Sequence, residues 1–190
     1  EDRCVMEGKA FLVRFTTDWT CGLLWNKLYK RALFDGIFFE EGHKIDDEYF
    51  TYQGVMNAAK VVCDPRVVYN YRQRASSVMQ SPAARAQIAV DRIDFMAKRR
   101  EKVLERFPEL RREFDISFVD ALSYLAKYPD NTEQSIRLLK YYARRYFLQR
   151  GNTFPPRYLL KAVFLMYATG TEKLLKRPQA KKPSPEDYYV

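Results

Sequence analysis

The sequence has few of the residues on which several structural classes depend. Its 190 residues include 7 glycines, 3 cysteines and 1 histidine. So few glycines disfavour an architecture of many strands and tight turns. Three cysteines without a CxxC spacing indicate neither a disulfide framework nor a zinc site. No apolar run approaches the roughly 18 residues of a membrane-spanning helix. Because the cysteines do not indicate disulfide bonds, the simplest interpretation is a protein of a reducing compartment, and we expect a cytoplasmic location.

Charge is abundant but unevenly distributed. Hydrophobic residues make up 47% of the chain and charged residues 30%, a composition typical of folded domains. Residues 1–80 hold 11 basic and 11 acidic residues, whereas residues 81–190 hold 22 basic and 13 acidic, so the second half carries the whole net charge of +9. A basic surface attracts polyanions such as anionic lipid headgroups, nucleic acid or an acidic partner.

The first 80 residues mix helix and strand signals. Apolar spacing and helix stop signals predict three helices, at residues 7–15, 21–34 and 46–59. Residues 37–39 form a short extended piece. Valine and tyrosine predict two strands, at residues 60–63 and 66–71, joined around Asp64-Pro65.

After Pro82 the pattern becomes helical throughout. Amphipathic periodicity with prolines between the segments predicts four helices, at residues 83–107, 109–128, 132–150 and 157–168. The expected class is therefore α+β and predominantly helical. We expect a small mixed α/β part at 1–80, an all-helical extension at 81–178 and a charged, disordered tail at 179–190.

Three carboxylates, Asp46, Asp47 and Glu48, open the helix expected at 46–59. Acidic side chains at a helix start bind free N–H groups and complement the dipole, so an ordinary cap is one interpretation. The other is a general base, because a carboxylate within hydrogen-bond reach takes the proton of an acceptor hydroxyl. Asp46 and Glu48 also form an Asp-x-Glu pair that could hold a divalent cation.

Arg72 and Arg74 follow a tyrosine-rich segment and are separated by one residue. Alternate residues of an extended segment point the same way, so both guanidinium groups could converge on one anion. The arginine fork suits a diphosphate, with Ser76 and Ser77 as further hydroxyl donors. The alternative is two solvated surface charges.

A short segment that starts at Trp25 combines aromatic and basic residues. Trp25, Lys27 and Tyr29 could form a wall that stacks on sugar rings and hydrogen-bonds to them, or Trp25 could belong to the core. His43 is the single histidine. It could contact a phosphate or a metal ion, or be an ordinary loop residue.

The helical half contains no catalytic cluster. Its basic residues interleave with apolar ones and indicate a surface that rests on an anionic membrane, a nucleic-acid module or a plain solvated face. The basic members are Arg144, Arg145, Arg150, Lys161, Lys173, Lys176 and Arg177, and the apolar members are Tyr141, Tyr146, Phe147, Leu159, Leu160, Phe164 and Leu165.

Several segments in order resemble the C-terminal half of bacterial family 2 glycosyltransferases, which have a GT-A fold. The resemblance covers about residues 20–80. It rests on Trp25-Asn26-Lys27-Leu28-Tyr29-Lys30-Arg31, Phe39-Glu40-Glu41-Gly42, Asp46-Asp47-Glu48-Tyr49-Phe50-Thr51-Tyr52 and Tyr69-Asn70-Tyr71-Arg72-Gln73-Arg74 with Ser77.

The resemblance implies a role for each segment. Asp47 would be the general base, and Asp46 stands where the family usually has glutamate. The donor diphosphate would bind Arg72, Arg74 and Ser77, and the acceptor would bind Trp25, Asn26, Lys27 and Tyr29. The intact family uses a divalent metal ion, Mg²⁺ or Mn²⁺, held by an Asp-x-Asp motif that this sequence lacks. His43 and Glu48 are the weaker metal candidates in this chain.

The family's nucleotide-binding half is not found in the sequence. Only 24 residues precede Trp25, fewer than the ~30 of one βαβ unit. The chain starts at Glu1 without an initiator methionine, so we expect an acceptor-side piece that does not turn over alone.

The predicted function is inverting transfer of a sugar from a nucleotide-diphosphate sugar to the hydroxyl of a saccharide or lipid-linked acceptor. The products would be surface polysaccharide or lipopolysaccharide, made at the inner face of the cytoplasmic membrane. The alternative is a non-catalytic interaction or membrane-surface-binding module. Further possible partners are an anionic membrane surface and a second copy of the chain, whereas the sequence does not favour nucleic acid.

Overall fold

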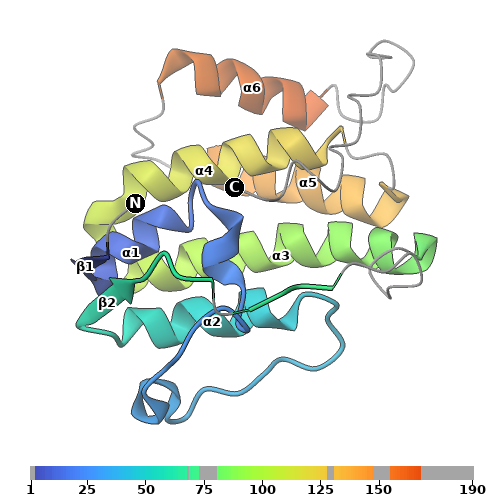
Figure 1. Ribbon diagram of the computed structural model, residues 1–190. Coiled ribbons are helices and arrows are strands. Elements are labelled where there is room, and N and C mark those ends of the chain that lie inside the picture. Colours follow the sequence, from blue (N-terminus) through green and yellow to red (C-terminus); the bar gives the residue numbers. More distant parts are fainter. Residues whose placement is uncertain (1–2, 68, 73–80, 128–130, 148–154, 168–190) are drawn as a thin grey trace.

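Most of the chain forms helices stacked around one long central helix, as the computed structural model shows (Figure 1). The structure describes residues 3–67, 69–72, 81–127, 131–147 and 155–167. In chain order its elements are β1 (Cys4–Glu7), α1 (Gly8–Arg14), the 3-10 helices η1 (Trp19–Gly22) and η2 (Arg31–Phe34), α2 (Asp46–Met56), β2 (Lys60–Cys63), α3 (Pro82–Arg106), the 3-10 helix η4 (Pro108–Leu110), α4 (Arg111–Leu125), α5 (Glu133–Phe147) and α6 (Pro156–Tyr167). The predicted class, a predominantly helical α+β chain, is confirmed.

Helix α3 organises the packing on both of its sides. Its start is fixed by Ser81, whose hydroxyl accepts a hydrogen bond from the N–H of Ala84 at 3.1 Å. One apolar cluster joins α1 and α2 to Ile88 and Phe95 of α3. A second joins α4, α5 and α6 to Ile93 of α3. The predicted division near residue 80 therefore marks a change of secondary structure and not a boundary between separate cores.

The small sheet pairs β1 with β2 in antiparallel fashion, in the register Cys4↔Cys63 to Glu7↔Lys60. The strand predicted at 60–63 is confirmed, but its predicted partner at 66–71 is wrong. The Asp64 carboxylate accepts hydrogen bonds from the backbone N–H and the guanidinium of Arg66, at 3.1 and 2.8 Å. Such a local turn, with proline after the aspartate, does not have the backbone twist of a hairpin turn. Strand β1 carried no prediction.

The helix predicted at 21–34 is also wrong. The structure has η1 and η2 there, separated by an irregular loop. The side chain of Asp18 accepts hydrogen bonds from the N–H and the hydroxyl of Thr20, at 2.9 and 2.6 Å. These bonds cap the start of η1, and the backbone turns extended at Leu23, with φ −66° and ψ 131°, so the helix does not continue. Further along, the ring of Phe34 lies against Gly54 of α2, where a Cβ would be 2.2 Å from the Phe34 Cζ atom. The extended piece predicted at 37–39 does not pair as a strand.

The predictions for the second half agree with α3, α4, α5 and α6 to within a few residues at each described end. The tail predicted at 179–190 lies outside the described residues. None of the helices in the described ranges has the length and apolar character needed to cross a bilayer.

Candidate functional site

Asp47 lies in the first turn of α2 and faces the loop that follows η1. Its carboxylate is partly buried and accepts hydrogen bonds from the N–H of Glu48, at 3.0 Å, and from the N–H of Leu24. Burial raises the pKa of Asp47, and the negative charge of Asp46 adds to the rise, while the bonds to backbone N–H groups oppose it. A carboxylate whose pKa is raised binds a proton more readily, which is the property that a general base needs.

Asp46 is placed differently, although it is the adjacent residue. It is exposed, and its Oδ1 atom accepts a hydrogen bond from the N–H of Asp47 at 3.1 Å. The acidic pair is thus divided into one inward and one outward carboxylate. Of the two, Asp47 is the partly buried carboxylate, and its role as a base stays a prediction.

Two hydroxyl groups lie near the Asp47 carboxylate. Thr51 is one helical turn after Asp47 on α2 and is fully buried. The hydroxyl of Tyr29 is next to that of Thr51, and burial raises the pKa of Tyr29 to about 12. The contact falls short of good hydrogen-bond geometry, and neither hydroxyl has another partner among the described residues. Buried hydroxyls of this kind are suited to bind a ligand hydroxyl or a water molecule.

Lys27 closes the loop between η1 and η2. Its Nζ atom donates to the carbonyl oxygens of Thr20 and Leu23, at 3.1 and 2.6 Å, and to Oδ1 of Asn26, at 2.6 Å. Burial lowers the pKa of Lys27 to about 8, and the negative charge of Asp47 is among the influences that oppose this shift. All three protons of the ammonium group are used within the loop. Lys27 therefore holds the loop between η1 and η2 in shape, and its predicted contact with an acceptor stays a prediction.

We expect Lys27→Met to destabilise the fold by about 1–3 kcal/mol, because three oxygen atoms lose a charged donor. The free energy of unfolding in urea measures this change. Lys30→Met is the matched control, since Lys30 is exposed and hydrogen-bonds to the described residues only through its backbone carbonyl, at 3.0 Å from the N–H of Leu33. It should change stability by less than about 0.5 kcal/mol. Equal stability of the two variants would contradict the role given to Lys27.

Trp25 contacts a segment that lies more than 40 residues later in the chain. Its ring is stacked on Tyr71, with centroids 5.2 Å apart and planes at 10°, and it meets Tyr69 at 4.6 Å and 33°. All three rings are about half exposed. The three rings form an aromatic triplet that contains only one residue of the predicted wall, Trp25, because Tyr29 packs edge-on against Phe34 at 5.0 Å instead. The other two members, Tyr69 and Tyr71, were not among the predicted acceptor-binding residues. Their alternate spacing was the signal that could have found them.

The remaining predicted site residues are less closely placed. Asn26 is exposed and donates to the carbonyl oxygen of Thr20 at 3.3 Å. Arg72 directly follows Tyr71 and is exposed, without an ion pair to a described residue. Arg74 and Ser77 lie outside the described residues. Binding of a donor diphosphate by these groups stays a prediction.

The weaker metal candidates, His43 and Glu48, share no partner. The imidazole of His43 is 3.2 Å from the carboxylate of Asp91 and 3.5 Å from that of Glu40. Glu48 packs on Gly22 and has a raised pKa through burial, which the charge of Arg99 partly offsets. In the part of the chain that the structure describes, no three His, Cys, Asp or Glu side chains are grouped as metal ligands.

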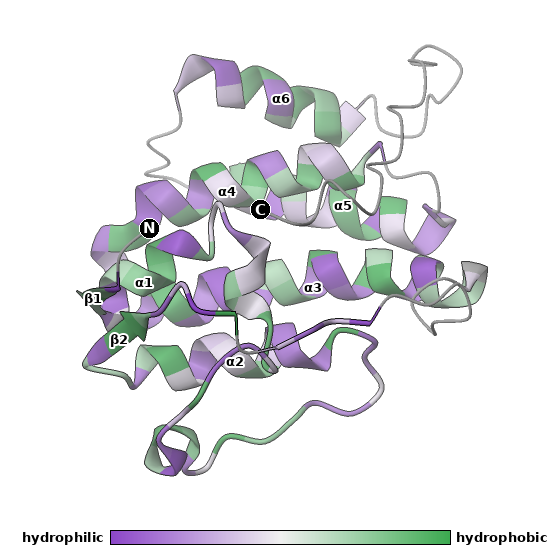
Figure 2. Cartoon of the chain, viewed as in Figure 1, coloured by the Kyte–Doolittle hydropathy of each residue, from purple (hydrophilic) through white to green (hydrophobic). Residues whose placement is uncertain are grey.

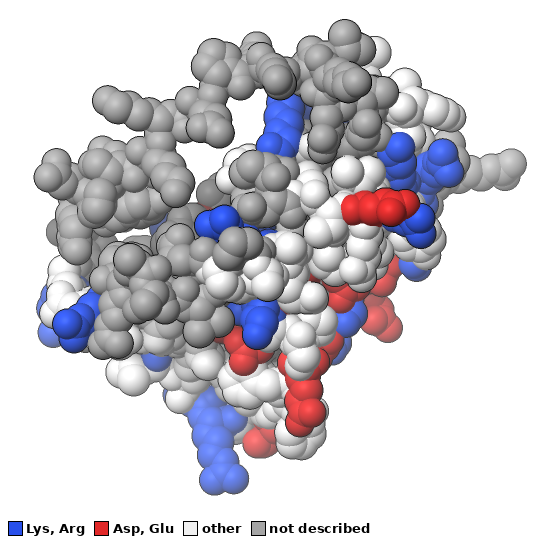
Figure 3. Space-filling view, turned by 90° about the vertical axis from the view of Figure 1, so that its right-hand side faces the viewer, with Lys and Arg blue, Asp and Glu red and all other residues white. Residues whose placement is uncertain are grey.

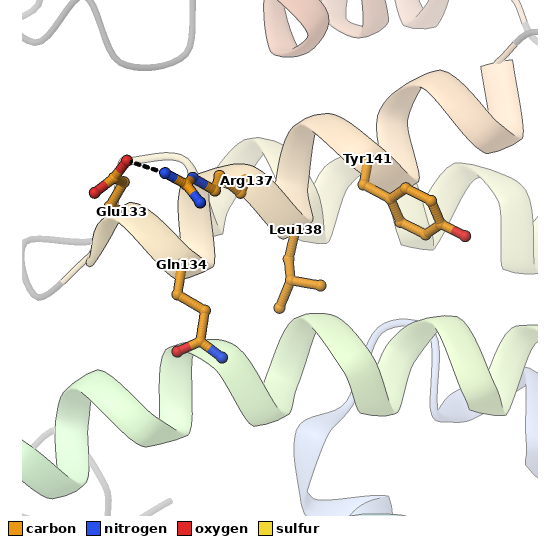
Figure 4. A pocket seen from close by; sticks show the side chains of 5 residues that line it. All are labelled: Glu133, Gln134, Arg137, Leu138 and Tyr141. Atoms are coloured by element: carbon orange, nitrogen blue, oxygen red, sulfur yellow. Dashed lines mark hydrogen bonds and ion pairs between the residues drawn. The ribbon is translucent and has the colours of Figure 1, made fainter.

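A shallow hollow of about 440 Å³ lies along α5 (Figure 4). Its lining residues are Glu133, Gln134, Arg137, Leu138 and Tyr141. Glu133 and Arg137 neutralise each other as an ion pair. None of the predicted site residues lines this hollow, and it holds no acid and base that face a common point.

Charges on the described surface are mixed in sign. On the face shown in Figure 3, basic and acidic side chains lie between one another and form no continuous field of one sign. Two apolar residues of the predicted basic surface are also not on the surface, because Tyr146 and Leu165 are 2% and 1% exposed. Both belong to the core between α3, α5 and α6.

Comparison of the chain with protein-family models, with curated proteins and with solved structures gives no match. The interpretation of the site therefore rests on this chain's own residues, above all on Asp47 and the aromatic triplet.

Proposed function

We propose that the chain is the acceptor-side part of an inverting glycosyltransferase that uses a nucleotide-diphosphate sugar. The observation that carries this proposal is the placement of a partly buried carboxylate, Asp47, beside the loop that also bears Trp25. Trp25 in turn stacks on Tyr69 and Tyr71. A base next to exposed aromatic rings suits a saccharide, since the apolar faces of sugar rings pack on aromatic surfaces.

The chemistry assigned to the site is a single displacement. Asp47 takes the proton of an acceptor hydroxyl, the hydroxyl oxygen attacks the anomeric carbon, and the bond to the nucleoside diphosphate breaks. Arg72 and Arg74 would stabilise the negative charge that develops on the departing diphosphate. The described residues assemble no oxygen ligand set for Mg²⁺ or Mn²⁺, and no step of the proposal involves a metal ion of this chain.

The test is transfer by the protein expressed from its complete reading frame. A panel of radiolabelled nucleotide sugars is incubated with bacterial surface oligosaccharides, and labelled product is separated from the donor. Incorporation with inversion at the anomeric carbon is the expected result. Absence of both transfer and donor hydrolysis with every donor would overturn the proposal and leave a non-catalytic module.

One observation favours a second function, attachment to an anionic membrane surface. Helix α6 lies on the outside of the stack and is apolar around most of its circumference (Figures 1 and 2). One side of it packs on α4 and α5. Large apolar side chains remain exposed on the other side: Leu159, Leu160, Val163, Phe164 and Tyr167.

Basic residues border this exposed face of α6. At about 3.6 residues per turn, Arg157 and Lys161 lie along one edge of it. The helix contains no acidic residue, and α5 adds four basic residues and one acidic residue. Part of this positive charge is neutralised, because Lys161 forms an ion pair with Asp120, Arg137 with Glu133 and Arg145 with Glu101. An apolar face with a basic edge binds bilayers that contain anionic lipid. Attachment of this kind would bring the site to a lipid-linked acceptor.

We expect Leu160→Glu to weaken binding to vesicles of phosphatidylcholine with phosphatidylglycerol by at least about tenfold, because it places a charge in the apolar face. Vesicle flotation measures the bound fraction. Phe38→Glu is the matched control, since Phe38 is 79% exposed and Leu160 74%. Phe38 belongs to the segment between η2 and α2, and that segment lies on the opposite side of the molecule from α6 (Figure 1).

Three outcomes would contradict membrane attachment. The first is an unaltered chain that does not float with anionic vesicles. The second is a Leu160→Glu variant that binds vesicles as well as Phe38→Glu does. The third is a chain that is a dimer in solution and that Leu160→Glu dissociates. The last outcome would show that a second copy covers α6.

A further inference from the structure

The sheet brings two of the three cysteines together. Cys4 of β1 and Cys63 of β2 are directly opposite each other in the antiparallel register, and both are free thiols. Burial, and next to it the neighbouring Cys4 thiol, raise the pKa of Cys63, and Nη1 of Arg14 lies 3.6 Å from the Cys63 Sγ atom. The third cysteine, Cys21, is buried in the core, and burial raises its pKa to about 11.

The register alone is compatible with a covalent bond. Directly opposite residues of antiparallel strands have Cα atoms about 4.5–5.5 Å apart and side chains on the same face. A disulfide bond needs Cα atoms about 4.4–6.8 Å apart. The Cys4–Cys63 pair is also the last pair of the sheet, where small adjustments of the backbone meet the least resistance.

We propose that Cys4 and Cys63 form a reversible disulfide bond by exchange with a low-molecular-weight disulfide. Cys4 is exposed and Cys63 partly buried, so the Cys4 thiolate attacks first. It forms a mixed disulfide and releases one thiolate. The Cys63 sulfur then attacks Cys4 and releases the second thiolate. The two protons lost by Cys4 and Cys63 protonate these thiolates, so the protein is oxidised by two electrons and the small disulfide is reduced to two thiols.

The bond would enclose most of the described acceptor-side residues in one covalent loop, but not Tyr69 and Tyr71. Trp25, Tyr29 and Asp47 all lie between Cys4 and Cys63, and Tyr69 follows Cys63 by six residues. A cross-link over a loop of this length lowers the entropy of the unfolded chain considerably. Oxidation would therefore stabilise the fold around the candidate site. This inference does not depend on the proposed transferase activity.

The test compares the purified chain in glutathione disulfide and in dithiothreitol. Peptide mapping by mass spectrometry should find Cys4 linked to Cys63 after oxidation, with Cys21 still a thiol. The melting temperature should rise on oxidation, on the order of 5–10 °C. Cys4→Ser and Cys63→Ser should each abolish the rise, whereas Cys21→Ala, whatever its own stability, should keep it.

Three results would overturn the proposal. The first is a Cys4 that carries only glutathione and is not linked to Cys63. The second is a disulfide-linked peptide that contains Cys21. The third is a rise in melting temperature that persists in both serine variants.

Discussion

Asparagine at position 47 is expected to lower the rate of sugar transfer by about 10²–10⁴-fold in the protein expressed from its complete reading frame. That range is the contribution of a well-placed general base. An amide nitrogen and oxygen have the size of a carboxylate but do not accept a proton at neutral pH. Initial rates with saturating donor measure the effect, and the Michaelis constant for the acceptor should change less than the turnover number.

The same variant should remain folded. Because burial raises the pKa of Asp47 above its ordinary value of 3.8, the stability linked to this group is complete below about pH 3.8. It is lost as the pH rises through the raised value. Asparagine has no charge, so at neutral pH it avoids the free energy that burying the ionised Asp47 carboxylate costs. At pH 7, Asp47→Asn should therefore unfold at the same urea concentration as the unaltered chain or at a higher one.

Asp46→Asn is the matched control for the base. It removes one carboxylate from the same helical turn, but from the exposed position. Its effect on turnover should stay within a few-fold of the unaltered protein. Equal rate losses in the two variants would show that only the charge of the turn matters, and an unchanged rate in Asp47→Asn would remove Asp47 from the mechanism.

The second large effect is expected at a buried ion pair between α3 and α4. The side chains of Arg100 and Asp115 are 5% and 3% exposed, and Nε of Arg100 donates to Oδ1 of Asp115 at 2.6 Å. The guanidinium group also lies over the ring of Tyr146, 4.3 Å from its centroid. Asp115→Ala leaves this positive charge buried without a counter-ion, so we expect a loss of about 3–5 kcal/mol.

Urea unfolding at pH 7 measures this loss, and an exposed pair provides the control. Lys9 and Glu109 form an ion pair at 3.0 Å with about half of each side chain in solvent. Glu109→Ala should therefore cost less than about 1 kcal/mol. Similar losses in Asp115→Ala and Glu109→Ala would mean that the Arg100–Asp115 pair does not have the buried character described here.

Local signals were enough to predict much of the helical half. Ser81 and Pro82 mark the start of α3, and further prolines separate the helices that follow it. Each of these signals acts within a few residues of the structure that it determines. The start of α2 at Asp46 was predictable for the same reason.

Non-local contacts explain what the sequence did not reveal. The stacking of Trp25 on Tyr69 and Tyr71 joins residues more than 40 positions apart. The partner of β2 lies at the N-terminus of the chain, at Cys4–Glu7, and not in the next segment. In both places contacts between residues far apart in the chain outweighed the local strand or helix propensity. The inward and outward division of Asp47 and Asp46 likewise depends on the loop that packs on α2.

The most direct test of the candidate acceptor site uses the two tryptophans of the chain. Trp25 belongs to the aromatic triplet, whereas Trp19 is 65% exposed in η1 and serves as an internal control. Each gives one indole N–H signal in a ¹⁵N correlation spectrum. During titration with bacterial surface oligosaccharides, the Trp25 signal should shift with saturation while that of Trp19 stays in place. Saturable binding that leaves Trp25 unmoved would contradict the account.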